Sequence, residues 1–204
     1  MNNSEMSKGI IFATSNKNKM VEVRKILEEL GMQVLSMEEA GIHINIEENG
    51  KTFEENALIK AKSIYEMENN SIILADDSGL EIDYLNKEPG IYSARYAGEN
   101  TSYEVKNQLL LDRLKGVKPD QRTARFVCAI AAVFPDGSSE MVKGVVEGQI
   151  GMECKGENGF GYDPIFYIPE LHKTTAELSL EEKNKVSHRG RALEIVKELI
   201  KCRM

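Results

Sequence analysis

Hydrophobic residues recur along the chain at two spacings, which predict alternating strands and helices. Short apolar runs ending in small polar residues predict strands at 9–13, 33–36, 42–46, 71–75 and 80–84. After the first of these, apolar residues at helical spacing from Met20 to Leu30 predict a helix that Gly31 ends. Strand therefore alternates with helix in the first part of the chain.

The rest of the chain adds a hairpin and several capped helices. The apolar stretch 124–134 meets a Pro-Asp-Gly-Ser turn signal at 135–138, and 140–149 follows as its antiparallel partner. Helix-start signals at Thr52, Thr101-Ser102 and Ser179 predict helices ending near 68, near 114 and soon after 182, and 191–201 reads as an amphipathic helix. The pattern predicts an α/β fold with a mixed sheet.

Composition limits the functional classes. The chain has 204 residues, 41% of them hydrophobic and 29% charged, as in soluble globular proteins. A net charge of −7 argues against non-specific binding to nucleic acid. No apolar run resembles a membrane span or a secretory signal, so we expect a cytoplasmic protein with no membrane partner. We expect a flexible tail at 1–8 and a single domain at 9–204.

The spacing of the cysteines and of the basic residues indicates which ligands the chain could bind. Three cysteines lie far apart without a C-x-x-C pair, which favours free thiols over zinc or disulfides. Basic residues gather at 17/19, at 122/125 and at 183–191. A small anionic ligand held in a local basic pocket is compatible with the acidic total.

The strand–turn–helix at 10–19 is the first candidate site. Lys17 and Lys19 stand where a helix begins, although a helix N-terminus already carries partial positive charge. An anion bound by the lysines and free backbone N–H groups would remove the conflict. The segment is neither a Walker A loop nor a dinucleotide fingerprint. The alternative is an ordinary strand–turn–helix with solvated lysines.

A pair of carboxylates forms the second candidate site. An apolar strand runs into Asp76 and Asp77, followed by a Ser-Gly turn, at the strand end where α/β sheets bind ligands. Two adjacent carboxylates favour a cation between them, and Mg²⁺ prefers such oxygen ligands. Glu47 or Glu48 could add a carboxylate. A plain surface turn is the alternative.

The third candidate combines a glycine-rich aromatic loop with a second basic helix start. In 156–164, Phe160 and Tyr162 could sandwich a flat ring while Asp163 reads its edge. Ser187 resembles an N-cap, which would put two cations in the first turn of the last helix. A core-plugging loop and a solvated basic face are the alternatives. Together, the three candidates fit a purine nucleotide whose phosphates carry Mg²⁺.

The chain resembles the inosine triphosphate pyrophosphatase family, in order from residue 9 to the C-terminus. The segments that carry the resemblance are ATSNKNK (13–19), TFEENA (52–57), ADDSGL (75–80), PGIYSARY (89–96), GFGYDPIF (159–166) and SHRG (187–190). The resemblance implies an elongated mixed sheet flanked by helices, in two lobes with an active-site cleft between them, and a homodimer.

The resemblance also implies an activity. It is the Mg²⁺-dependent hydrolysis of deaminated purine nucleoside triphosphates (XTP, ITP and dITP) to the monophosphate and pyrophosphate. This reaction would cleanse the nucleotide pool and prevent incorporation of these nucleotides into DNA and RNA.

The resemblance assigns roles residue by residue. Asp77 would be the proton acceptor and a metal ligand, and Glu47 the second ligand, with Glu48 adjacent. The residues implied to bind substrate are Thr14, Ser15, Asn16, Lys17, Asn18, Lys19, Lys60, Ser78, Phe160, Gly161, Tyr162, Asp163, Lys183, His188 and Arg189.

Two other functions remain open at this stage. A non-catalytic nucleotide-binding protein would keep the basic helix starts without needing the Asp pair. A pyrophosphatase for methylated or bulky pyrimidine nucleotides, such as the maf-like group, would share the chemistry and differ in the base.

Overall fold

The computed structural model describes residues 9–203 and contains one seven-stranded mixed sheet. The strand order is β2-β1-β3-β4-β5-β6-β7. The strands are β1 (Ile10–Phe12), β2 (Val34–Ser36), β3 (Ile72–Ile82), β4 (Thr123–Val133), β5 (Ser139–Ile150), β6 (Phe166–Ile168) and β7 (Lys173–Thr174). Strand β1 pairs in parallel with β2 and β3, whereas β6 pairs antiparallel with β5 and β7. The predicted α/β class is confirmed.

Three helices begin at the caps that the sequence indicated, whereas the first begins at Lys17, after an Asn16 cap, and the last begins at His188, three residues before the predicted 191. The helices are α1 (Lys17–Leu27), α2 (Phe53–Tyr65), α3 (Tyr103–Arg113), α4 (Leu180–Val186) and α5 (His188–Lys201). The side chains of Thr52, Ser102 and Ser179 each accept a backbone N–H of the first turn. Ser187 accepts the backbone N–H of Gly190 at 3.0 Å, as an N-cap does.

Two local predictions are wrong. Residues 42–46 form no strand: the backbone there is irregular, and only Ile42 of its three isoleucines is buried. The predicted strand end at Asp76 and Asp77 and the Ser-Gly turn after it are also wrong, because β3 continues from Ile72 to Ile82 without a break. Strand β1 pairs with β3 only at Ile72–Leu74, and β4 is the other neighbour of β3 in the sheet, so sheet pairing carries β3 past the point where its apolar run ends.

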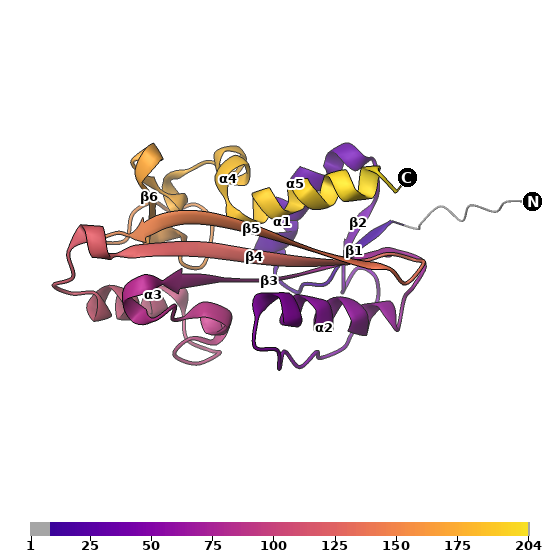
Figure 1. Ribbon diagram of the computed structural model, residues 1–204, viewed down its shortest axis with the longest axis horizontal. Helices are drawn as coiled ribbons and strands as arrows, with labels where there is room; N and C mark the ends of the chain where they lie inside the picture. The colour runs from indigo at the N-terminus through magenta and orange to yellow at the C-terminus, as the bar shows by residue number, and fades with distance from the viewer. Residues whose placement is uncertain (1–8, 204) are drawn as a thin grey trace, which may run out of the picture. The chain divides into compact units, whose positions relative to one another are not determined.

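Residue contacts divide the chain into two compact units. The first unit contains the residues up to 77, 129–143 and those from 192 on. In this unit α2 covers one face of the strands, and α1 and the later part of α5 cover the other (Figure 1). Its core includes Val23, Leu27, Ile73 and Leu193, which are all buried.

The second unit contains 78–128 and 144–191 and has its own core. Leu80, Leu110, Phe126, Tyr162 and Phe166 are among the buried residues of one apolar cluster there. Hydrophobic burial therefore supports α3 and the segment that follows β5.

The expected tail at 1–8 lies outside the described residues. The single domain at 9–204 and the cleft between lobes stay predictions. Within residues 9–203, none of the helices combines the length and the apolar character that crossing a bilayer requires.

Candidate active site

The predicted strand–turn–helix at 10–19 is present, and the side chain of Asn16 caps the start of its helix. Asn16 Oδ1 accepts the backbone N–H groups of Asn18 at 2.9 Å and Lys19 at 3.2 Å. The Asn16 N–H donates to Thr14 Oγ1 at 3.1 Å. Two of the amides expected to face an anion are therefore already bonded to the Asn16 side chain.

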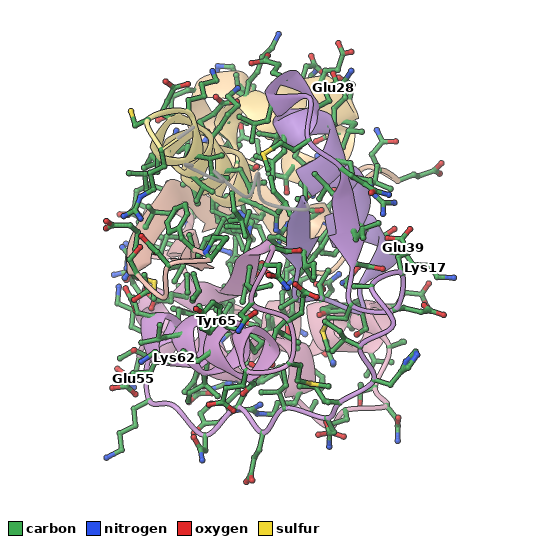
Figure 2. All side chains as sticks on the ribbon, turned by 90° about the vertical axis from the view of Figure 1, so that its right-hand side faces the viewer. Lys17, Glu28, Glu39, Glu55, Lys62 and Tyr65 are labelled. Atoms are coloured by element: carbon green, nitrogen blue, oxygen red, sulfur yellow. The ribbon has the colours of Figure 1, made fainter. Side chains whose placement is uncertain are left out.

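The two lysines of this turn have different surroundings. Lys19 Nζ lies 2.9 Å from Oδ1 of Asp76, whose side chain is 1% exposed. Lys17 is exposed and extends away from α1 (Figure 2), and Ser15 is exposed beside it. The protein thus supplies its own anion for Lys19, which offsets the unfavourable position of this cation at a helix N-terminus.

Asp77 lies at the centre of a polar cluster in the first unit. Asn56 Nδ2 donates to Asp77 Oδ2 at 3.0 Å, and Lys60 Nζ lies 4.0 Å from Asp77 Oδ1. Lys60 Nζ is also 3.3 Å from Glu48 Oε1. Helix α2 carries both Asn56 and Lys60, one turn apart, so its capped start aims them at the same carboxylate.

The charge state of Asp77 reflects opposing effects. Burial raises the pKa of Asp77 above its usual value, while Lys60 and the Asn56 hydrogen bond lower it. The nearby carboxylates of Glu48 and Asp76 raise it further. The net rise in pKa means that this carboxyl gains from an additional cation, which would hold it in its charged form.

The chemistry of this cluster fits a magnesium ion that arrives with a polyphosphate. The carboxylates of Asp77 and Glu48 both face one cationic group, the Lys60 ammonium. Within residues 9–203, no three His, Cys, Asp or Glu side chains are grouped to hold a metal. Mg²⁺ commonly takes only one or two carboxylates plus phosphate oxygens and waters, so two suffice. Glu47, the predicted second ligand, is exposed, whereas its neighbour Glu48 is half-buried.

In the second unit, Asp163 holds the aromatic loop together. Its Oδ2 accepts the backbone N–H of Phe160 at 2.8 Å and Lys183 Nζ at 2.6 Å, and its Oδ1 accepts Thr175 Oγ1 at 2.8 Å. Gly159 has φ +74°, and a Cβ there would collide with Asp163 Oδ2. The carboxylate that was expected to read a base edge therefore faces inward and shapes the loop.

The two aromatic residues of the loop differ in exposure. Tyr162 is buried in the core, and its hydroxyl donates to the carbonyl of Ser93 at 2.8 Å. Phe160 is only half-buried. Two cations lie near its ring: Lys183 Nζ is 4.7 Å and Arg189 Cζ is 5.6 Å from the ring centroid. Phe160 is thus the aromatic of this loop that retains an exposed surface.

The start of α5 brings further predicted residues together in the second unit. Arg189 Nη2 donates to Ser78 Oγ at 3.1 Å. The His188 ring stacks on Phe126, with centroids 4.7 Å apart and an interplanar angle of 19°. His188 and Arg189 are both at least nine-tenths buried, so their position is set by packing as well as by the helix cap.

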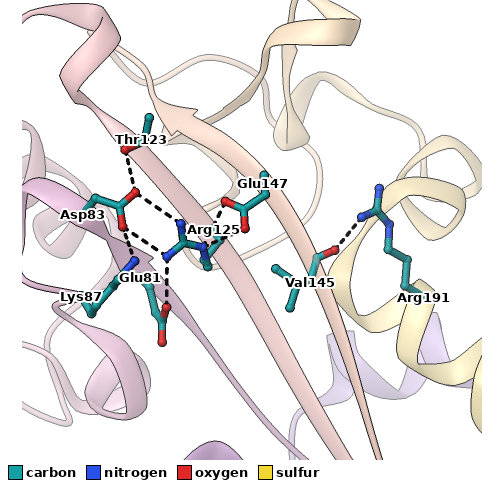
Figure 3. Close-up of polar contacts among 8 residues, drawn as sticks. All are labelled: Glu81, Asp83, Lys87, Thr123, Arg125, Val145, Glu147 and Arg191. Atoms are coloured by element: carbon teal, nitrogen blue, oxygen red, sulfur yellow. Dashed lines mark hydrogen bonds and ion pairs between the residues drawn. The ribbon is translucent and has the colours of Figure 1, made fainter.

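Other basic residues have partners within the second unit (Figure 3). Arg125 is paired with Asp83 at 3.2 Å, with Glu147 at 2.9 Å and with Glu81 at 3.6 Å. Arg191 Nη1 donates to a backbone carbonyl, that of Val145, at 2.6 Å. These cations support the fold around β3, β4 and β5.

Two residues that contact the predicted site residues are not among those the sequence indicates. Asn56 stands in the recognised segment 52–57, so its motif could have indicated it. Thr175, which donates to Asp163, lies outside every motif quoted above and carried no signal.

Comparisons with known proteins agree with the fold and the motifs. A protein-family model described as the Ham1 family matches residues 10–199. A relative from Clostridium perfringens named dITP/XTP pyrophosphatase is 49% identical over 199 residues, covering 95% of this chain and 98% of its own. A Bacillus subtilis relative of the same name is 48% identical over 195 residues, covering 96% of this chain and 98% of its own. The structure of the Staphylococcus aureus Ham1 protein is similar, with a TM-score of 0.85 and 42% identity, over 96% of this chain and 99% of that one.

Proposed function

The chain belongs to the Ham1 family, and on this premise we propose that it hydrolyses XTP, ITP and dITP to the monophosphate and pyrophosphate. The family resemblance seen in the sequence is confirmed by relatives that bear the name dITP/XTP pyrophosphatase. The structural observation that carries the proposal is the environment of Asp77, a buried carboxylate oriented by Asn56 and flanked by Lys60.

The proposed chemistry is attack of water on the α-phosphorus with pyrophosphate leaving. Asp77 accepts a proton from the water or orients it, and Asn56 keeps the carboxylate in place. Asp76 accepts a hydrogen bond from Lys19, which supports a positioning role for this second carboxylate. Mg²⁺, held by Asp77 with Glu48 or Glu47, would polarise the phosphoryl oxygens and neutralise the leaving group when it is bound.

The phosphate chain is assigned to the first unit. The Thr14–Lys19 turn and Lys60 supply hydrogen-bond donors and positive charge for the phosphoryl oxygens. The negative charge that develops in the transition state strengthens these contacts relative to the ground state, which is what accelerates the reaction.

The purine is assigned to the second unit. The half-exposed ring of Phe160 offers a stacking surface, and His188, Arg189 and backbone N–H groups near Phe160 are candidate donors for a 6-oxo group. Adenine carries an amino group at this position and would leave a donor of the site unpaired. In well-built sites such a mismatch lowers kcat/KM by roughly 10⁴-fold. Guanine shares the 6-oxo group, so its 2-amino group must be excluded by shape or by an unpaired contact.

The cellular role follows as part of the same proposal. Removal of these nucleotides would keep them out of DNA and RNA. We expect the enzyme to act in the cytoplasm as a homodimer, and the three cysteines, which form no disulfide, fit a reducing compartment. Its partner is the nucleotide substrate, with neither a nucleic acid nor a membrane among the proposed partners.

A substrate panel tests the proposal. Pyrophosphate release is measured with ITP, XTP, dITP, GTP, ATP, dUTP and 5-methyl-UTP, with Mg²⁺ and after chelation with EDTA. We expect rapid, Mg²⁺-restored turnover of the deaminated purines. If ITP and XTP were hydrolysed no faster than ATP, the proposed substrate class would be wrong, and preference for 5-methyl-UTP would favour the pyrimidine alternative.

A variant pair tests the catalytic assignment. Asp77→Asn is expected to abolish pyrophosphate release while ITP still binds, measured by calorimetry. The matched control is Asp112→Asn, which changes an exposed aspartate in α3 and should leave turnover unchanged. Unchanged turnover in Asp77→Asn would favour the non-catalytic nucleotide-binding alternative.

A further inference from the structure

One face of α3 contacts the aromatic loop of the second unit. Asn107 is 3% exposed, and its Nδ2 donates to the carbonyl of Gly161 at 3.1 Å. One turn earlier, the Tyr103 ring meets the Tyr162 ring edge-on, with centroids 5.3 Å apart. Residues four apart lie on the same side of a helix, so α3 supports two consecutive residues of the loop.

The orientation of the Asn107 amide follows from its partner. The Gly161 carbonyl only accepts hydrogen bonds, so the Asn107 NH₂ group must face it. Asn107 Oδ1 then points elsewhere, and within residues 9–203 this buried oxygen has no hydrogen-bond partner. The side chain therefore makes one bond and leaves one buried acceptor unpaired.

Fold stability does not account for this arrangement. A buried acceptor without a partner costs more free energy than one ordinary hydrogen bond contributes. Buried polar groups are nearly always paired, so an exception calls for another reason. Leucine, which is similar in size and has no polar atom, would satisfy the packing at this position at least as well.

The partner of Asn107 supplies that reason. Gly161 has φ +71°, and it lies between Phe160 and Tyr162 in the loop. A hydrogen bond to its carbonyl fixes the Gly161–Tyr162 peptide, one peptide beyond the one that follows Phe160, whose ring is half-buried. The backbone N–H of Phe160 is fixed from the other side by Asp163.

We propose that Asn107 is a positioning residue for base recognition. Through the Gly161 carbonyl it holds the Phe160 ring in the orientation that receives the purine, and the protein retains it at a cost in stability. This inference rests on the proposed function, because it takes Phe160 as the stacking surface for the base.

The test separates base recognition from phosphate binding. In Asn107→Leu, kcat/KM for ITP should fall by about 10- to 100-fold, the size of effect expected when a contact group shifts by about 1 Å. The fall should appear mainly in KM, and the ratio of kcat/KM for ITP over ATP should fall with it. Inhibition by inorganic tripolyphosphate, which has no base, should be unchanged. The Tm should equal or exceed that of the wild type.

Two further variants complete the design. Asn107→Asp keeps the shape but removes the donor, and it should lower the ITP/ATP ratio in the same way. Leu110→Val lies one turn further along α3 in the apolar core and should lower the Tm without changing the ratio.

Each alternative outcome has a distinct meaning. An ITP/ATP ratio equal to that of the wild type in both Asn107 variants would overturn the inference. A parallel loss of ITP turnover, tripolyphosphate inhibition and Tm would also overturn it, because that pattern indicates a purely structural role. A wild-type enzyme without preference for ITP would instead overturn the proposed function.

Discussion

Replacing Lys183 with Met should destabilise the protein strongly, because it leaves a buried carboxylate without its cation. Lys183 Nζ lies 2.6 Å from Asp163 Oδ2, and the two side chains are 4% and 3% exposed. Water cannot take over the role of the missing ammonium at that depth. The same substitution at a surface lysine removes only a screened, solvated charge.

The magnitude follows from the remaining partners of Asp163. Breaking a buried ion pair by removing one partner costs about 3–5 kcal/mol. Asp163 would keep two donors, the Phe160 N–H and the Thr175 hydroxyl, so we expect the lower end, about 3 kcal/mol. In a chain of this length, that corresponds to a fall in Tm of about 6–12 °C.

The assay is a double-mutant cycle read by urea unfolding. Lys183→Met, Asp163→Asn, the double variant and wild type are compared, with Lys155→Met as the surface control. The double variant should lose less stability than the two single losses combined, since removing both charges leaves neither one unpaired. Additivity within about 0.5 kcal/mol would show that the pair is not coupled and would refute this reasoning. A Lys183→Met variant as stable as Lys155→Met would refute it as well.

Three further perturbations probe other parts of the fold. Hydrogen bonds from Lys87 and Thr123 are the chief cause that lowers the pKa of Asp83 from 3.8 to about 2. The ionised carboxylate therefore stabilises the fold above pH 3.8, and this stability is lost as the pH falls toward 2. Asp83→Asn should reduce the dependence of the Tm on pH between these two values. Thr52→Ala removes the α2 N-cap and should cost about 1 kcal/mol in urea unfolding. Arg122→Met deprives three backbone carbonyls of a buried donor and should cost about 3 kcal/mol or more, measured as a fall in Tm.

Local signals predicted the helices well. A cap such as Thr52 or Ser179 acts on backbone groups two or three residues away, so its effect is complete within the segment that carries it. The glycine that ends the first helical region acts equally locally, because Gly31 adopts the left-handed conformation, with φ +64°.

Strands depend on partners that the sequence does not display. The alternation at 42–46 indicates only that one side of the segment is covered, which an irregular extended segment also achieves. Conversely, the polar residues 76–79 resemble a turn, yet β3 continues through them within the sheet, where β1 pairs with its first residues only and β4 is its other neighbour. In both cases pairing across the sheet, and not local preference, decides the outcome.

The same limit applies to the charged motifs. A cation at a helix start or a carboxylate at a strand end is costly when it stands alone, so each motif indicates a partner of opposite charge. The structure relieves two of these costs internally, through the pairs Lys19–Asp76 and Asp163–Lys183. Sequence reveals the residue types but not which distant charges meet. An ion pair of this kind indicates that one charge orients the other, as Asp76 holds the ammonium of Lys19 at the start of α1.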